Sequence, residues 1–325
     1  MSDLWNEDAY AHLLLTRTFS TTQKERIQEV RKCLNHKVSI AEMDHHTPKD
    51  AIEVFTRLNT KGKRLSQAEI KSAAVASTHH GFIRDYVVPL TDSLRSEGFE
   101  HVTMNHLFKA CAAIAAPAGQ DARQLPALKS QEIHAAWKQV ETGLKLAKDL
   151  LDSEFGVRDM RLMRSGSLLI VPMVVLGTSK AKTRPTAELA GWLAMASLFH
   201  RYSGSSETAI DQDLKACQSQ DRIGALLKLL RAHNKGSLTA TSLDFRGALA
   251  DRGALFAAYV GCRQTGAVDP FNGGALSHTK SIEHHHIIPR ATFPAGETRD
   301  ADVIANMAFI SASSNASIGK SHASE

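Results

Sequence analysis

The chain has 325 residues, of which 43% are hydrophobic and 22% charged, and its formal net charge is +5 at pH 7. This length and composition are those of an ordinary globular protein with one large or two medium domains. The mildly basic balance allows a polyanionic partner without requiring one.

The cysteine pattern and the hydropathy narrow the class of protein further. The four cysteines lie far apart and form no C-x-x-C pair, so the sequence supports neither a zinc ribbon nor a disulfide framework. The N-terminus has acidic residues and no apolar signal region. The longest apolar run, 168–176, is far shorter than the ~20 residues that a membrane span needs. We therefore expect a soluble, cytoplasmic protein.

Helical periodicity dominates the first 263 residues. A helix is expected over 22–34, and a short alternating segment over 38–43 is the one strand predicted in this half. Pro48 is expected to open a helix that ends at Leu58. Further amphipathic helices are expected at about 104–116, 130–152, 186–201, 219–233 and 246–263.

Two segments do not follow this helical pattern. Residues 168–176 are a buried helix or a buried strand, and periodicity alone does not decide between them. Residues 264–279 are rich in turn-forming residues and lack periodicity, so we place a domain boundary there.

Charge is distributed unevenly along the chain. Residues 158–184 contain six Lys or Arg residues against one acid, whereas residues 280–325 contain four against five Asp or Glu residues. The C-terminal segment is therefore not itself basic, and the helical part must help if the protein holds DNA electrostatically. A solvated face is the alternative interpretation of the basic stretch.

The residues that indicate a chemistry lie in this C-terminal segment. Three consecutive histidines end at His286, which is followed by Ile-Ile-Pro; Asn306 lies 20 residues further on, and Asn315 another nine. These spacings suit a strand, a loop and the start of a helix. Such an arrangement is typical of an HNH, or ββα-metal, nuclease, which needs an imidazole base, a divalent metal and a polar side chain that fixes the loop.

Each residue can then be given an expected role. His286 is the predicted general base. Asn306 is expected to fix the loop and to orient the His286 imidazole. His285 and Asn315 are predicted to hold one Mg²⁺ or Mn²⁺ ion, with water and phosphate oxygens completing its shell. The alternative is an incidental surface cluster or adventitious metal site. Basic side chains expected to contact DNA are Arg290, Lys320, Arg161 and Arg164.

Three segments, in order along the chain, resemble the GmrSD-like family of modification-dependent (type IV) restriction and phage-defence proteins. Residues 286–289, 305–310 and 315–318 look like the family's C-terminal HNH domain. Residues 53–66 resemble the end of its ParB-like N-terminal domain, and 201–213 resemble its helical middle region. The resemblance implies a ParB-like remnant over 1–80, a helical domain over 81–263 and an HNH domain over 264–325. The expected fold class is thus mainly α, with a small ββα-metal module at the end.

The chain departs from that family in one respect. Family members carry an Asp-Gly-Gln-Gln-Arg motif linked to nucleotide hydrolysis, and no such motif, Walker loop or G-x-G-x-x-G occurs here. The resemblance therefore implies a truncated chain, for which a separate partner chain could supply the nucleotide-binding lobe.

The sequence predicts a metal-dependent DNA endonuclease or nickase that restricts foreign or modified DNA. Two alternatives remain at this point. One is a non-catalytic DNA-binding or assembly subunit of a defence complex. The other is a toxin-like nuclease without a specific target.

Overall fold

The computed structural model describes residues 7–32, 47, 50, 53–54, 57, 67–116, 122, 124–163, 165–204, 206–245, 251–276, 281–294 and 301–318. The chain divides into two compact units, Met1–Ala51 and Ile52–Glu325. The expected strand over 38–43 lies outside the described residues, as does most of the helix expected after Pro48. Among the described residues, no helix is long and apolar enough to cross a membrane.

The smaller unit is a pair of short helices, α1 (Glu7–Thr16) and α2 (Thr21–Arg31). Ser20 caps α2: its Oγ accepts from the Gln23 N–H at 3.3 Å, and the Gln23 side chain accepts from the Ser20 N–H at 2.9 Å. This capping box satisfies two backbone donors that the helix leaves open. The helix therefore starts one residue earlier than the pattern of apolar residues predicts.

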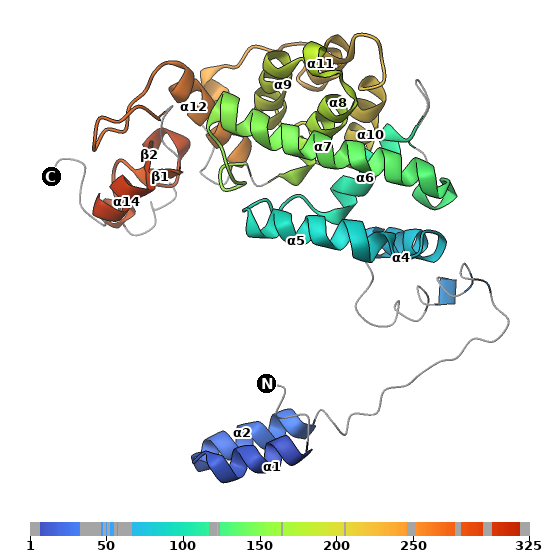
Figure 1. Ribbon diagram of the computed structural model, residues 1–325. Helices are drawn as coiled ribbons and strands as arrows, with labels where there is room; N and C mark the ends of the chain where they lie inside the picture. The colour runs from blue at the N-terminus through green and yellow to red at the C-terminus, as the bar shows by residue number, and fades with distance from the viewer. Residues whose placement is uncertain are drawn as a thin grey trace. The chain divides into compact units, whose positions relative to one another are not determined.

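The larger unit is mainly helical (Figure 1). Its helices before the C-terminal sheet are α4 (Gln67–Thr78), the π-helical turn η3 (Ile83–Val87), α5 (Val88–Ser96), α6 (Met104–Ile114), η4 (Leu125–Ala127), α7 (Ser130–Phe155), η5 (Gly166–Leu169), α8 (Ile170–Thr178), η6 (Ala181–Thr183), α9 (Thr186–Leu198), α10 (Ser206–Ala216), α11 (Arg222–His233), η7 (Ser242–Phe245) and α12 (Arg252–Gln264).

Helices α6, α7, α9, α11 and α12 overlap the ranges that the periodicity predicts, and the undecided apolar run forms the end of η5 and most of helix α8. Helix α10 was not predicted, because its inward face carries a charged residue. Asp213 on that face is fully buried and accepts from Arg201 Nε at 3.0 Å and Nη2 at 2.9 Å, and from the Tyr202 hydroxyl at 2.9 Å. This buried ion pair joins the end of α9 to α10. It gives Arg201 a partner within the helical body.

Helices α7 and α8 form the centre of the core, and glycines allow their close approach. Every residue from Ile170 to Leu176 is buried. An added Cβ at Gly143 of α7 would lie 2.0 Å from the Met173 carbonyl oxygen, and one at Gly177 of α8 would lie 2.3 Å from the Gln139 carbonyl oxygen. The two backbones are therefore too close for any side chain at these positions.

The C-terminal part contains a two-stranded antiparallel sheet followed by a helix. β1 (Ile282–His286) pairs with β2 (Met307–Ser311), and α14 (Ala312–Ile318) follows β2 directly. Between the strands lie the short turns η9 (Arg290–Thr292) and η10 (Ile304–Asn306). The predicted fold class is confirmed at this level: a mainly helical chain with a small antiparallel sheet near its C-terminus.

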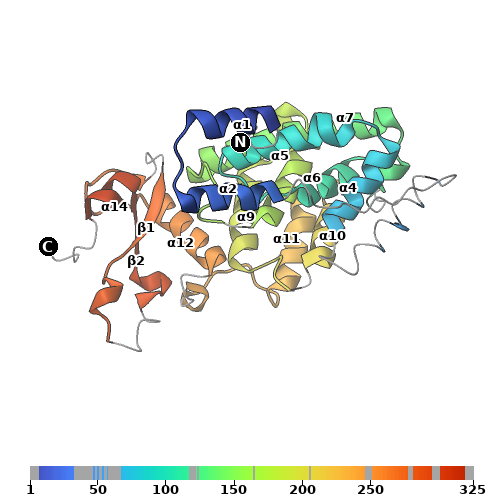
Figure 2. The ribbon, with the colours of Figure 1, turned by 90° about the horizontal axis from the view of Figure 1, so that it is seen from below.

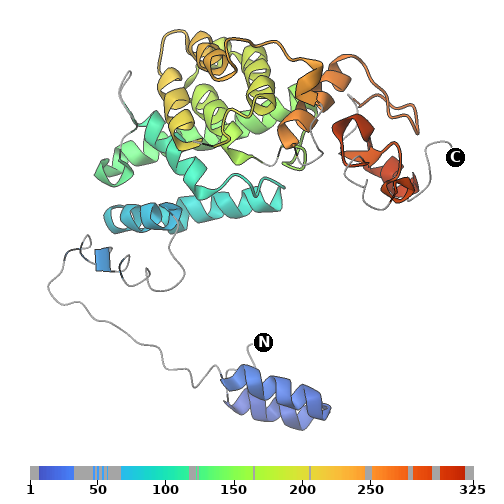
Figure 3. The same ribbon diagram turned by 180° about the vertical axis from the view of Figure 1, so that it is seen from behind.

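Helix α12 lies between the helical body and this sheet (Figures 2 and 3). Its Tyr259 is fully buried, and its ring meets the Phe309 ring of β2 edge-on at 5.4 Å. The Tyr259 hydroxyl donates to the Phe155 carbonyl at the end of α7, at 2.8 Å. A single aromatic side chain thus joins the sheet to the helical core.

The glycine contacts give a test of the core packing. Gly143→Ala should lower the free energy of unfolding by roughly 2 kcal/mol or more, because the new methyl group collides with the α8 backbone. Gly191→Ala, in the exposed face of α9 with open space around it, should raise it by roughly 0.5–1 kcal/mol. Urea unfolding measures both. Equal effects of the two substitutions would contradict this packing.

Candidate functional site

Strand β1 separates the candidate residues onto two faces. Because side chains alternate along a strand, Glu283 and His285 share one face, and His284 and His286 the other. On the first face, His285 Nδ1 lies 2.9 Å from Oδ1 of Asn315 in α14. The Nδ2 group of Asn315 donates to the Glu283 carboxylate. The structure therefore brings together the two residues predicted as metal ligands, from the first strand and the helix.

The pair has the donor chemistry for a divalent ion. An imidazole nitrogen and an amide oxygen are both metal ligands in proteins, and two neighbouring ligands of one ion at about 2.1 Å lie about 3 Å apart. In this structure His285 Nδ1 and Asn315 Oδ1 hydrogen-bond at 2.9 Å, and this separation is also the spacing of two neighbouring ligands; Nδ1 would bind an ion only in its unprotonated form. In the part of the chain that the structure describes, no cluster of three or more His, Cys, Asp and Glu residues could hold a metal.

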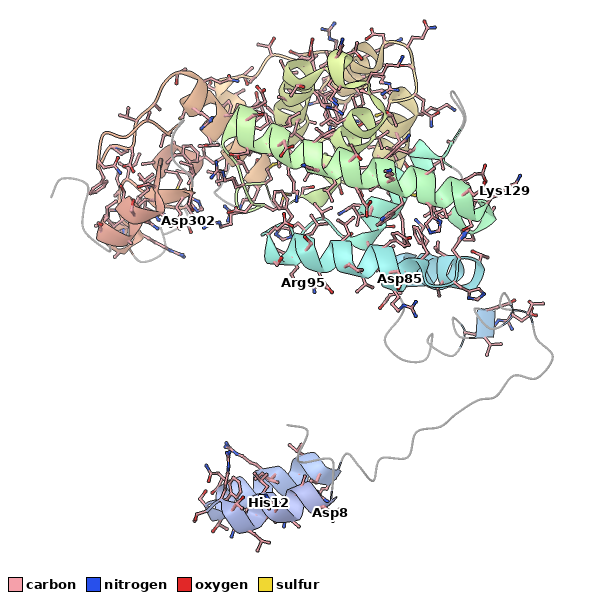
Figure 4. The ribbon with its side chains drawn as sticks, in the orientation of Figure 1. Asp8, His12, Asp85, Arg95, Lys129 and Asp302 are labelled. Carbon is pink, nitrogen blue, oxygen red and sulfur yellow. The ribbon has the colours of Figure 1, made fainter. Side chains whose placement is uncertain are left out.

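His286, the predicted base, has a carboxylate partner that the sequence analysis missed. Its Nε2 lies 2.9 Å from Oδ1 of Asp302, and Oδ2 of Asp302 lies 3.5 Å from the Arg290 guanidinium. Asp302 lies beside the sheet (Figure 4). The one signal in the sequence was an acid four residues before Asn306. The His286 and Asp302 side chains are 29% and 33% exposed, so solvent and a large substrate can reach them.

Asn306 holds the chain that follows β1. Its Nδ2 group donates to the carbonyls of Ile288 and Ala301, both at 2.9 Å, and its Oδ1 accepts from the Ile288 N–H at 2.8 Å. The side chain is buried, at 7% exposure. The amide therefore joins the backbone after β1 to Ala301. All three hydrogen bonds go to backbone atoms, so its effect on His286 comes through the loop, and Asp302 is the side chain that contacts the ring.

The buried acid Asp269 fixes the start of α14. Its carboxylate accepts from the Ser311 N–H at 2.9 Å, the Ser314 hydroxyl at 2.7 Å and the Phe271 N–H at 3.0 Å. Burial alone would raise the pKa of Asp269, but these hydrogen bonds stabilise the carboxylate and lower the pKa to about 2. The turn-rich segment before β1 thus positions the helix that carries Asn315.

The four basic residues predicted to contact DNA have different surroundings. Arg290 is exposed and lies next to Asp302. Arg161 lies after α7, pairs with Asp159 at 2.7 Å and reaches Ser281 and Glu283 at the start of β1. Arg164 and Lys320 lie outside the described residues.

Asp269 makes stability depend on pH. Its pKa in the folded chain lies below its ordinary value of 3.8, so its contribution is present above about pH 4 and is lost as the pH falls towards 2. The advantage of the wild type over Asp269→Asn in unfolding free energy should shrink by about 2 kcal/mol between pH 6 and pH 2. Urea unfolding across this range measures it. A difference independent of pH would show that the carboxylate charge is not stabilised here.

Asn306→Ala should lower the free energy of unfolding by roughly 2–4 kcal/mol, because the buried Ala301 carbonyl and the partly buried backbone groups of Ile288 lose their partners. Ser317→Ala is the matched control, because Ser317 is exposed on α14 of the same module and its hydroxyl donates to the Ser313 carbonyl one turn earlier; it should cost less than half as much. Hydrogen exchange at the Ile288 amide should speed up only in the Asn306 variant. Unchanged exchange there would contradict the role of Asn306 in fixing the loop.

No model of a known protein family matches the sequence, and no curated protein matches it. The resemblance to GmrSD-like proteins therefore stays a prediction, and the function has to be argued from the geometry of the site.

Proposed function

We propose that the chain is a divalent-metal-dependent DNA endonuclease or nickase of the HNH type. One observation carries the proposal: His285 and Asn315 face each other across β1 and α14, and the neighbouring His286 is held by a carboxylate. An imidazole base on the residue next to a metal-binding side chain, in the order strand, strand, helix, is the residue order that phosphodiester hydrolysis at a ββα centre needs.

The roles of the protein's own groups follow from the contacts. If His286 Nε2–H donates to Asp302, Nδ1 is the ring nitrogen that accepts a proton from the attacking water. The same carboxylate then stabilises the imidazolium that forms. His285 and Asn315 would hold Mg²⁺ or Mn²⁺, which would stabilise the charge on the phosphate and on the leaving oxygen. Imidazole is a better ligand for Mn²⁺ than for Mg²⁺, so we expect higher activity with Mn²⁺.

The surroundings of the site favour a polymeric substrate. The histidines are partly exposed, and the exposed side chains of Ile287, Ile288 and Arg290 follow them. A cleft of about 620 Å³ lies between α4, α6 and α10, and none of its lining residues belongs to the site. An accessible centre with an adjacent arginine suits a phosphate backbone better than a small enclosed ligand.

The biological setting of the proposal rests on the sequence resemblance. We place the activity in restriction of foreign or modified DNA in the cytoplasm, with a separate chain supplying a nucleotide-binding lobe. One imidazole base per chain suits cleavage of one strand. Cutting both strands then takes two copies or two successive nicks.

Plasmid nicking by the purified chain tests the proposal. With Mn²⁺ or Mg²⁺, supercoiled DNA should become nicked, and EDTA should stop the reaction. His286→Ala should lower the rate about 10²- to 10⁴-fold, the usual contribution of a general base. Asp302→Asn should lower it about tenfold or more, because the ring loses the charge that orients it.

Asp92→Asn is the matched control, because Asp92 is an exposed acid on α5 that pairs with Arg95 at 3.1 Å; it should nick like the wild type. Nicking that survives in His286→Ala would remove that residue from the mechanism. A folded protein that nicks neither modified nor unmodified DNA, even with its partner chain present, would instead support a non-catalytic assembly subunit.

A further inference from the structure

We propose that Glu283 and Arg161 are positioning residues that couple the helical body to the metal-binding side chains. The inference rests on the proposed function, since it concerns the same pair of ligands. From the sequence alone, Glu283 has no expected role and Arg161 is expected to contact DNA.

The first step concerns the orientation of the Asn315 amide. Its oxygen faces His285 Nδ1 at 2.9 Å, and its nitrogen donates to the Glu283 carboxylate. The two ends of an amide have nearly the same shape, so packing alone does not determine which end faces the histidine. A carboxylate accepts hydrogen bonds and does not donate them, so Glu283 selects the nitrogen. Glu283 thereby directs the oxygen, the end that binds a metal, towards His285.

The second step concerns what holds Glu283. Its other carboxylate oxygen lies 3.7 Å from Nη1 of Arg161, and Nη2 of Arg161 donates to the Ser281 hydroxyl at 3.0 Å. Arg161 thus spans the first residues of the β1 region from a loop of the helical body. With one oxygen near Arg161 and the other engaged by Asn315, Glu283 is placed to orient a ligand rather than to be one.

The third step concerns the anchoring of Arg161 itself. Its Nε donates to Asp159 at 2.9 Å, and its backbone N–H donates to the same side chain at 3.0 Å. The preceding residue, Met160, is buried and donates its N–H to the Gly98 carbonyl at 2.9 Å. The loop between α7 and η5 is therefore fixed on the helical core. A chain of contacts runs from this core through Arg161, Glu283 and Asn315 to His285.

This arrangement has a measurable consequence for metal affinity. Partners that orient a metal ligand typically change affinity 10- to 100-fold when they are removed. Glu283→Ala should weaken Mn²⁺ binding by this factor, and Arg161→Ala by about threefold to tenfold, because it acts one contact further away. Glu283→Gln keeps an oxygen that accepts from Asn315, so its affinity should stay within about fivefold of the wild type.

The experiment is Mn²⁺ titration of the full chain without DNA, by calorimetry and by the EPR signal of free Mn²⁺. Arg158→Ala is the matched control, because Arg158 belongs to the same loop but pairs with Asp152 at 2.8 Å; its affinity should equal that of the wild type. Arg161→Ala should have no further effect in a Glu283→Ala background, since its action passes through Glu283. Arg161→Lys should recover part of the affinity, because it restores a cation beside the carboxylate.

The outcomes separate this inference from the proposed nuclease. Suppose that the wild type binds Mn²⁺, that His285→Ala abolishes this binding and that the Glu283 and Arg161 variants weaken it as described. If DNA is then not nicked, the positioning roles stand and the nuclease proposal fails. If Glu283→Gln weakens binding as much as Glu283→Ala, Glu283 is itself a ligand and the inference is wrong. The inference would also be overturned if Arg158→Ala and Arg161→Ala had equal effects, or if the wild type bound no Mn²⁺. In either case, nicking with Mg²⁺ would leave the nuclease proposal intact.

Discussion

The register between β1 and β2 is the constraint on which the candidate site depends. His286 pairs with Met307, and Ile282 with Ser311. A shift of β1 by one residue would turn Glu283 and His285 away from α14 and put His284 and His286 there. A two-stranded sheet does not hold a register by itself in water. Here the buried side chains of Ile282, Phe309 and Ile310 restrict β1 and β2 to one alignment, and the Phe309 ring packs against Tyr259 of the helical body.

Two buried polar side chains stabilise the loop after β1 and the start of α14, which the small sheet does not hold alone. Asn306 closes the loop after β1 by bonding its backbone, and Asp269 holds the first turn of α14 through Ser311 and Ser314. Burying a polar side chain without hydrogen-bond partners costs free energy. Asn306 is therefore buried only when the loop is formed, and Asp269 only when the first turn of α14 is formed. Asn306 and Asp269 therefore tie the positions of His286 and Asn315 to the same folded state.

The sequence predicted the parts that depend on local pattern and on spacing. Apolar periodicity located α6, α7, α9 and α11, and the His286, Asn306 and Asn315 spacing anticipated a strand, a turn and a helix. Helix α10 escaped prediction because buried Asp213 interrupts its apolar face. Asp269, Asp302 and Glu283 carried no pattern of their own: two lie in or beside turn-rich segments, and their importance comes from partners distant in sequence. Such contacts, between residues 16 to 45 positions apart, arise only in the folded chain.

The electrostatics of the basic stretch also change once the contacts are known. Arg158 pairs with Asp152, and Arg161 with Asp159 and Glu283. Exposed ion pairs of this kind add little stability, but the acidic partners compensate part of the positive charge that would attract DNA. Arg290 is similarly shared with Asp302. The positive field around the site is thus weaker than the residue count suggests, and electrostatic attraction by these residues alone would hold DNA weakly. If the chain is a nuclease as proposed, a surface beyond these residues would have to hold its substrate.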